Sequence, residues 1–282
     1  MTIFSDNCAR FLQKMARRVC HIAPLFLLVA CAGAIPTQDE IRDDNKSAKA
    51  SQIMRVAETT ARGGDLTAAA GLFRRASILS PDDPAPLIKL GLTLSAAKAY
   101  RDAAEAFRDA LAIPQIPPED EAKARYGYGR VLISMDRPEL AVPEFKAVLA
   151  TRPGDAALLN ILGVALDLTG HHAQAQDRYR QSLENRPDVA SVRNNLGLSL
   201  ALSGAYDDAI KTLTILAKDP IAENRHKLNL ALVYGLAGRV EDATRAMSRL
   251  LTSEQIKSNL ATYENLRALT PEERAKVVFG FK

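Results

Sequence analysis

The sequence has few cysteines, and none of them lies in the body of the chain. Only three of the 282 residues are cysteine, and they are Cys8, Cys20 and Cys31. Residues 32–282 therefore contain no thiol. This excludes disulfide bonds and metal–thiolate sites from that part of the chain.

Histidine is also scarce, and no catalytic constellation is present. We expect His171 and His172 in a solvated turn and His226 on a helix surface, with no carboxylate or cysteine partner. Segment 127–129 lacks the third glycine of a dinucleotide-binding loop, and segment 197–201 lacks the second glycine of a nucleophile elbow. The sequence predicts no enzyme, no cofactor and no metal site.

The chain has little net charge once its first residues are set aside. The formal charge is +4, and residues 1–30 hold four cations and one aspartate. The remaining body is close to neutral, at about +1. A neutral body has no general attraction to nucleic acid, so none is expected as a partner.

The N-terminal apolar run is too short to cross a membrane. It extends from Ile22 to Ala30, about nine residues, whereas about 20 are needed. Basic residues precede it, and this order is typical of a signal peptide. The run ends in Leu28-Val29-Ala30-Cys31, which resembles the bacterial lipobox. An uncleaved apolar N-terminus with an incidental cysteine is the alternative.

The lipobox resemblance implies a lipoprotein with a signal peptide at 1–30. Cys31 would then be the first mature residue and would bear the acyl chains, which anchor it in the membrane. Ala32 in place of aspartate favours the outer membrane, with the body facing the periplasm. Residues 31–49 are expected to form the lipidated cysteine and a flexible tether. Met15 is an alternative start that gives a more typical signal length.

A 34-residue pattern occurs six times in the rest of the chain. An alanine recurs in each copy, a small residue lies twelve places before it and a large apolar residue four places after it. The alanines are Ala69, Ala103, Ala141, Ala175, Ala209 and Ala243. The small residues are Ala57, Gly91, Gly129, Gly163, Gly197 and Ala231. The large residues are Phe73, Phe107, Phe145, Tyr179, Leu213 and Met247.

This pattern resembles the tetratricopeptide repeat (TPR), in which two antiparallel helices form a hairpin and hairpins stack. The resemblance implies an all-α fold, a right-handed superhelical solenoid of about six repeats with a C-terminal capping helix. The repeats are expected at 50–83, 84–117, 122–155, 156–189, 190–223 and 224–257, together 50–257. The period breaks at residues 118–121, which we expect to form a longer loop.

A solenoid of this type binds partners on the face formed by the first helices. Places two, five, six and nine of each repeat are expected to face that groove. The predicted partner-binding residues there are Lys89, Lys123, Arg130, Asn160, Asn194, Asn195, Arg225 and Asn229. Arg55 shares this face, and Glu58 is the acidic exception. The alternative is that these side chains are merely solvated.

The asparagines and the apolar residues of the groove suit different ligands. Asparagine offers a donor and an acceptor, so a row of them suits an extended peptide backbone. The apolar residues between them suit an apolar side chain or an amphipathic helix. They are Ile88, Leu92, Ile161, Val164, Leu198 and Leu232.

The groove does not match the TPR clamp for a chaperone's terminal carboxylate. The best frame has Asn160, Val164, Asn195, Arg225 and Asn229, so the Lys-Asn pair and the last cation are missing. A clamp of that type is not expected.

The last segment, 258–282, is expected to form a helical cap and tail. Leucine and tyrosine at helical spacing predict a capping helix over 259–269. Thr270-Pro271-Glu272-Glu273 predicts a second N-terminus with a capping box. The apolar tail from Val277 to Phe281 either folds back on the cap or binds a partner.

The whole layout resembles that of TadD-like lipoproteins of Tad/Flp pilus assembly, and more loosely the pilotins of type IV pili. The resemblance implies a scaffold that binds a secretin subunit or another pilus component. A periplasmic adaptor that recruits a protease or a cell-wall hydrolase is the alternative.

Overall fold

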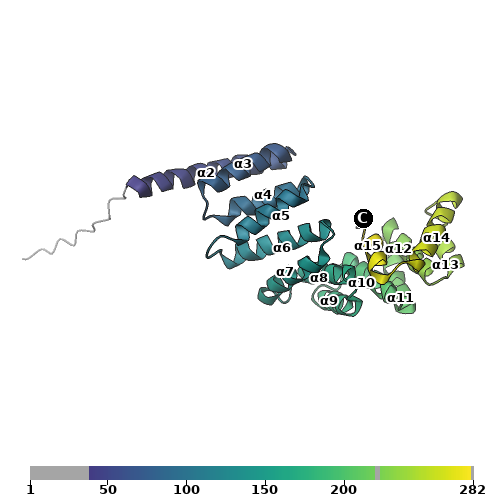
Figure 1. The fold of residues 1–282 in the computed structure, drawn as a ribbon. Coiled ribbons are helices and arrows are strands. Elements are labelled where there is room, and N and C mark those ends of the chain that lie inside the picture. Colours follow the sequence, from purple (N-terminus) through teal and green to yellow (C-terminus); the bar gives the residue numbers. More distant parts are fainter. Residues whose placement is uncertain (1–37, 220–222, 281–282) are drawn as a thin grey trace, which may run out of the picture. The chain divides into compact units, whose positions relative to one another are not determined.

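The computed structural model describes residues 38–219 and 223–280, which form helices joined by short turns and contain no strand (Figure 1). The helices are α2 (Gln38–Arg62), α3 (Leu66–Leu79), α4 (Pro84–Ala96), α5 (Tyr100–Leu111), α6 (Pro118–Ser134), α7 (Pro138–Thr151), α8 (Ala156–Leu168), α9 (His172–Asn185), α10 (Ala190–Leu202), α11 (Tyr206–Ala217), α12 (Asn224–Leu236), α13 (Val240–Met247), α14 (Ser253–Ala268) and α15 (Pro271–Val278). The chain divides into two units, 1–43 and 44–282, and all contacts described below lie within the second.

The signal segment, its apolar run and Cys31 lie outside the described residues. Among the helices that the structure does describe, none has the length and apolar character needed to span a membrane.

Successive helices pair as hairpins, and the hairpins stack. We call the first helix of a hairpin its A helix and the second its B helix. From α4 to α13 the two helices of each hairpin pack together, and each B helix from α3 onward also packs against the following A helix. Neighbouring A helices touch directly, as α4 with α6, and α10 with both α8 and α12. The TPR-type solenoid expected from the period is confirmed.

The recurring small and large residues meet inside each hairpin. All six alanines of the pattern are fully buried, and so are the large residues four places later. A Cβ added to Gly163 would lie 2.5 Å from Cε1 of Tyr179, so only glycine allows this approach. The ring of Phe107 lies so close to Gly127 of the next repeat that a Cβ there would be 2.4 Å away. One large side chain therefore joins two hairpins.

The four residues of the insertion at 118–121 do not form a loop, so that expectation was wrong. They are the first turn of α6, which has 17 residues where α4 and α8 have 13. Pro118 lies at the start of the helix, where proline is tolerated, and three acidic residues follow in the first turn. All three pair one turn later, Glu119 and Asp120 with Lys123 and Glu121 with Arg125. The sequence thus extends the helix at its N-terminus.

Part of the segment expected to be a flexible tether is helical. Residues 38–49, assigned above to a flexible tether, belong to α2. No proline or glycine interrupts the sequence between 38 and 62, so nothing stops the helix of the first repeat from extending toward the N-terminus. The other tether residues lie outside the described ranges.

A polar cluster interrupts the apolar core between repeats four and five. The carboxylate of Asp167, which is 0% exposed, accepts hydrogen bonds from Ser199 Oγ at 2.7 Å and Tyr179 Oη at 2.9 Å. His172 Nδ1 lies 2.8 Å from the same carboxylate. Burial raises the pKa of Asp167, while these three partners favour its ionised form. The cluster ties α8 and α9 to α10.

The C-terminal segment has the capping box that the sequence predicts at Thr270, but the packing of its last helix differs from the expectation. Thr270 and Glu273 form the capping box of α15, and a second box lies at Thr252 and Gln255 before α14. Helix α14 packs against α12 and α13, as a cap should. Helix α15 instead packs against α8 and α10. The last helix therefore folds back past the sixth repeat and contacts the A helices of repeats four and five.

We expect Gly163→Leu to lower the free energy of unfolding by at least ~1–3 kcal/mol, because the new side chain would overpack against Tyr179. Gly71→Leu is the matched control, since the Cβ of this exposed helical glycine would meet nothing within 4 Å. Thermal melts followed by circular dichroism measure both. Equal melting temperatures for Gly163→Leu and the parent would contradict the assigned packing.

We expect Tyr179→Phe to cost ~1–3 kcal/mol, because buried Asp167 loses one of its donors. The raised pKa of Asp167 means that the folded state keeps a proton that the unfolded chain has lost, so stability falls as pH rises from the ordinary value of 3.8 through the raised one. Removing the Tyr179 hydroxyl should raise this pKa further and extend the fall to higher pH.

Urea unfolding between about pH 4 and pH 8 tests this dependence. Tyr100→Phe, which removes a hydroxyl outside the cluster, should leave the pH profile unchanged. A profile of Tyr179→Phe that parallels the parent would show that Asp167 does not respond to this hydroxyl.

Candidate functional site

The A-helix face brings four of the predicted groove asparagines together. Asn229 Nδ2 donates to Asn194 Oδ1 at 2.8 Å, and Asn195 Nδ2 donates to Asn160 Oδ1 at 3.0 Å. Asn194 Nδ2 lies 3.5 Å from Asn195 Oδ1 and joins the two pairs. These amides form a continuous row over α8, α10 and α12, which we call the asparagine ladder.

The ladder has unused hydrogen-bonding capacity. A primary amide has two N–H donors and two acceptor lone pairs, and the three ladder bonds leave more than half of the donors and acceptors of the four amides unused. All four asparagines are half-buried, so their free donors and acceptors still reach solvent. An extended backbone running across α8, α10 and α12 has alternating N–H and C=O groups that match this row.

The predicted cations do not gather into one site. Lys89 pairs with Glu58 at 2.9 Å and lowers the pKa of that carboxyl through their hydrogen bond. Lys123 pairs with Asp120 at 3.0 Å, and Arg225 pairs with Glu223 at 2.8 Å. These exposed pairs leave the face with little net charge. They are also weak, at about 0–1 kcal/mol each.

Arg130 and Val164 further distinguish this face from a carboxylate clamp. The guanidinium of Arg130 lies 5.9 Å from the ring centroid of Tyr126 on its own helix. Val164, in a place where the clamp needs an amide, is buried. Within residues 38–219 and 223–280, the predicted cations therefore do not gather into a pocket for a terminal carboxylate.

The apolar residues at the ninth place form a second row on the same face. They are Leu92 on α4, Val164 on α8, Leu198 on α10 and Leu232 on α12. Leu92 is 47% exposed, whereas Val164 is 8% and Leu198 is 3% exposed. The row therefore has an open part on α4 and a covered part on α8 and α10.

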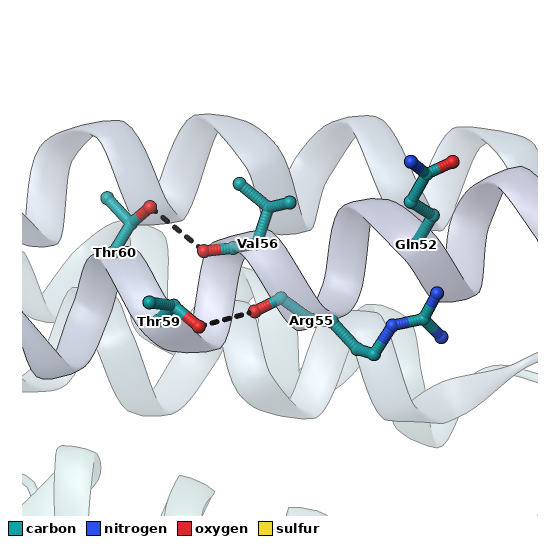
Figure 2. A pocket seen from close by; sticks show the side chains of 5 residues that line it. All are labelled: Gln52, Arg55, Val56, Thr59 and Thr60. Carbon is teal, nitrogen blue, oxygen red and sulfur yellow. Dashed lines mark hydrogen bonds between the residues drawn. The ribbon is translucent and has the colours of Figure 1, made fainter.

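A shallow hollow lies on α2, lined by Gln52, Arg55, Val56, Thr59 and Thr60 (Figure 2). All five come from one helix, and the two threonine hydroxyls donate to carbonyls of that helix. Val56 occupies the seventh place, which is buried as Leu90 and Leu162 in the second and fourth repeats. The hollow is thus the outer side of the first hairpin and has no constellation of reactive groups.

Two expectations for the histidines were wrong. His172 does have a carboxylate partner, Asp167, and His226 is not on the surface but 4% exposed. Burial, then the nearby Arg225, lowers the pKa of His226. A signal for the cluster was present, because Asp167 occupies the twelfth place, where Ile133 and Ala201 are core residues.

The Asp167 cluster is built for structure and not for catalysis. Ser199 donates to the carboxylate and not to a histidine, so the cluster lacks the serine–histidine pair of a nucleophilic site. Asp167 and Ser199 are fully buried, which leaves a substrate no access. Binding is the activity that the surface of the described residues supports.

Comparisons with known proteins agree with this architecture. A family model described as tetratricopeptide repeat matches residues 88–156 and 169–220. A search of curated protein sequences finds no match.

Several solved structures share the fold. PilW, described as a widely conserved type IV pilus biogenesis factor, has a TM-score of 0.63 and 20% identity, with 76% of this chain and 97% of PilW covered. PilF of Pseudomonas aeruginosa has a TM-score of 0.58 and 17% identity, over 78% of this chain and 99% of PilF. YrrB, described as a TPR protein with an unusual peptide-binding site, has a TM-score of 0.52 and 20% identity, over 62% of this chain and 88% of YrrB.

These likenesses establish the fold, and the family model supports it over the central repeats. The fold typically serves as a scaffold for protein or peptide partners and not as an enzyme. The chain is a tetratricopeptide-repeat solenoid whose A helices present an asparagine ladder beside an apolar row.

Proposed function

We propose that this chain is a lipid-anchored scaffold of the bacterial outer membrane that binds a component of a pilus assembly system in the periplasm. A secretin subunit is the proposed partner, as for a pilotin. The observation behind the binding role is the asparagine ladder, which aligns amides from three successive A helices.

The ladder suits a partner segment in an extended conformation. Its amides bond the backbone, which every sequence has, so selectivity has to come from side chains that reach the neighbouring apolar row. The near-neutral charge of the face favours a partner recognised by shape and hydrogen bonds over one attracted by charge.

Two further observations support the pilus setting. The sequence Leu28-Val29-Ala30-Cys31 resembles a lipobox, which would place the solenoid at a membrane surface. PilF and PilW, the latter described as a pilus biogenesis factor, share the fold over about three quarters of this chain. The likeness supports the proposal by analogy of architecture.

We expect Cys31→Ser to abolish acyl labelling and to release the protein from membranes, because Cys31 bears the acyl chains in this proposal. Metabolic labelling with a fatty acid and membrane fractionation measure both effects. Cys20→Ser, in the segment expected to be removed, should behave as the parent. Labelling that persists in Cys31→Ser would rule out the lipoprotein assignment.

We expect the double variant Asn195→Ala with Asn229→Ala to weaken partner binding at least tenfold, about 1.4 kcal/mol. The ladder would lose two amides, and each hydrogen bond to a partner contributes ~0.5–1.5 kcal/mol. The fold should persist, because both side chains are only half-buried and lie outside the hairpin seam.

The measurement is a titration of the purified protein with a secretin subunit from the same organism. Gln174→Ala, an exposed amide on α9 and so on a B helix, is the matched control. If the folded double variant binds as tightly as the parent, the asparagine ladder is not the partner-binding site. If the parent protein binds none of the pilus components, the proposed role in pilus assembly is wrong.

A further inference from the structure

The last described helix covers part of the A-helix face. Helix α15 begins with a complete N-terminal cap, since Thr270 accepts from the backbone N–H of Glu273 and Pro271 is the first helical residue. It packs against α8 and α10, which are both A helices, and it lies beside α10 in Figure 1. The chain thus places a helix on the surface where a TPR solenoid receives its partners.

The repeats on which α15 packs bury apolar residues at places that are more exposed in the first three repeats. At the ninth place, Val164 on α8 and Leu198 on α10 are buried, whereas Leu92 on α4 is 47% exposed. At the thirteenth place the same two helices have Leu168 and Leu202, both buried. Their counterparts in the first three repeats, Arg62, Ala96 and Ser134, are exposed. Repeats four and five therefore have an apolar floor, formed by Val164, Leu168, Leu198 and Leu202.

Helix α15 presents one apolar edge to the core. Ala275 is 0% exposed, and Val278 and Phe279 are partly buried in the same cluster as the apolar floor. Their spacing of three and four places puts them on one side of a helix. Val277, which lies off this edge, is 51% exposed. The helix is amphipathic, with its narrow apolar edge docked.

Polar contacts orient α15 on the floor. Lys276 Nζ lies 2.8 Å from the Asp136 carboxylate in the turn after α6. The Glu272 side chain lies against Gly170, whose added Cβ would be 2.5 Å from Glu272 Oε1. Arg274 donates to the carbonyls of Leu266 and Leu269 at the end of α14. Two of these contacts thus hold α15 at the turns that follow α6 and α8, and the third holds it at the end of α14.

The docking of α15 is limited in extent. It uses eight helical residues, with one fully buried small side chain and an ion pair that is exposed on both sides. A helix of this length is not stable in isolation, and exposed ion pairs contribute little. Leu232, at the ninth place of the next repeat, is only half-buried, whereas Leu198 on α10 is buried.

We propose that the apolar floor is a binding site for an amphipathic helix of a protein partner, and that α15 is an internal ligand which this partner displaces. The bound α15 defines the partner's chemistry: a helix with apolar residues at places i, i+3 and i+4 and a cation directed at Asp136. The site lies on the same face as the ladder of the proposed function, but it depends on neither the asparagines nor a pilus component.

The test uses the full chain in detergent and compares two substitutions on α15. Ala275→Asp places a charge against the apolar floor and should release the helix, whereas Val277→Asp changes an exposed side chain and should not. Amide hydrogen exchange of residues 271–279, followed by mass spectrometry, should be at least tenfold faster in Ala275→Asp than in the parent or in Val277→Asp.

A trans-binding measurement completes the test. The probe is a fluorescein-labelled synthetic peptide of residues 270–282, and anisotropy gives its Kd. It should bind the Ala275→Asp chain at least tenfold more tightly than the parent, and Leu198→Asp added to that chain should abolish binding. Equal peptide affinity for the parent and Ala275→Asp, or binding that survives Leu198→Asp, would overturn the proposal.

A charge exchange tests the orientation without disturbing the apolar contacts. Lys276→Glu should speed exchange of α15, and Asp136→Lys added to it should restore protection. Exchange that stays slow in Ala275→Asp would show that α15 is a fixed part of the fold and would also overturn the proposal. None of these measurements uses the pilus partner, so a failure of the proposed function leaves their outcome unchanged.

Discussion

The close contact between a small A-helix residue and a large B-helix residue is the constraint on which the rest of the structure depends. Gly163 against Tyr179 sets the distance between the helices of one hairpin, and Phe107 against Gly127 sets the distance to the next hairpin. Because the same contact recurs at Gly91, Gly129 and Gly197, successive A helices have similar orientations relative to their neighbours. Places five and six of successive repeats therefore meet, and amides 35 residues apart, such as Asn195 and Asn160, are within hydrogen-bond distance.

The Asp167 cluster adds directional hydrogen bonds between the helices that form the groove. Apolar contacts between stacked hairpins tolerate small rotations, whereas the hydrogen bonds from Tyr179 and Ser199 to one carboxylate fix α8 relative to α10. Asparagine amides on the same two helices require that relation to be constant, and α15 rests on both helices. Burying a carboxylate costs free energy, as its raised pKa indicates. The hydrogen bonds of the cluster offset this cost at the place where the register between α8 and α10 matters most.

Much of the fold follows from the sequence, because the spacing of Ala175, Gly163 and Tyr179 predicts the contact between the two helices of one hairpin. The same is true of the capping box at Thr270. The prediction of a loop at residues 118–121 was wrong, because proline followed by acidic residues suits both a loop and a helix start. Only the packing of the rest of α6 decides between them. The sequence predicted which places of each repeat face the groove, but it did not predict the hydrogen bonds and ion pairs that their side chains form. Whether Lys89 faces a ligand or pairs with Glu58 depends on side-chain geometry across two repeats. Nor does local spacing show that the helix of Ala275 packs on α8 and α10, which lie far earlier in the chain.

The two parts of the A-helix face favour different ligand conformations. A helical segment satisfies its own backbone and gains nothing from the amides of Asn194 or Asn229, whereas an extended segment exposes its backbone to them. The apolar floor begins one helical turn further along the same helices, about 6 Å away, and it already holds a helix. A single partner segment cannot be extended and helical at the same place. Full use of this face therefore requires a partner with both kinds of segment, or two partners that meet on α8 and α10.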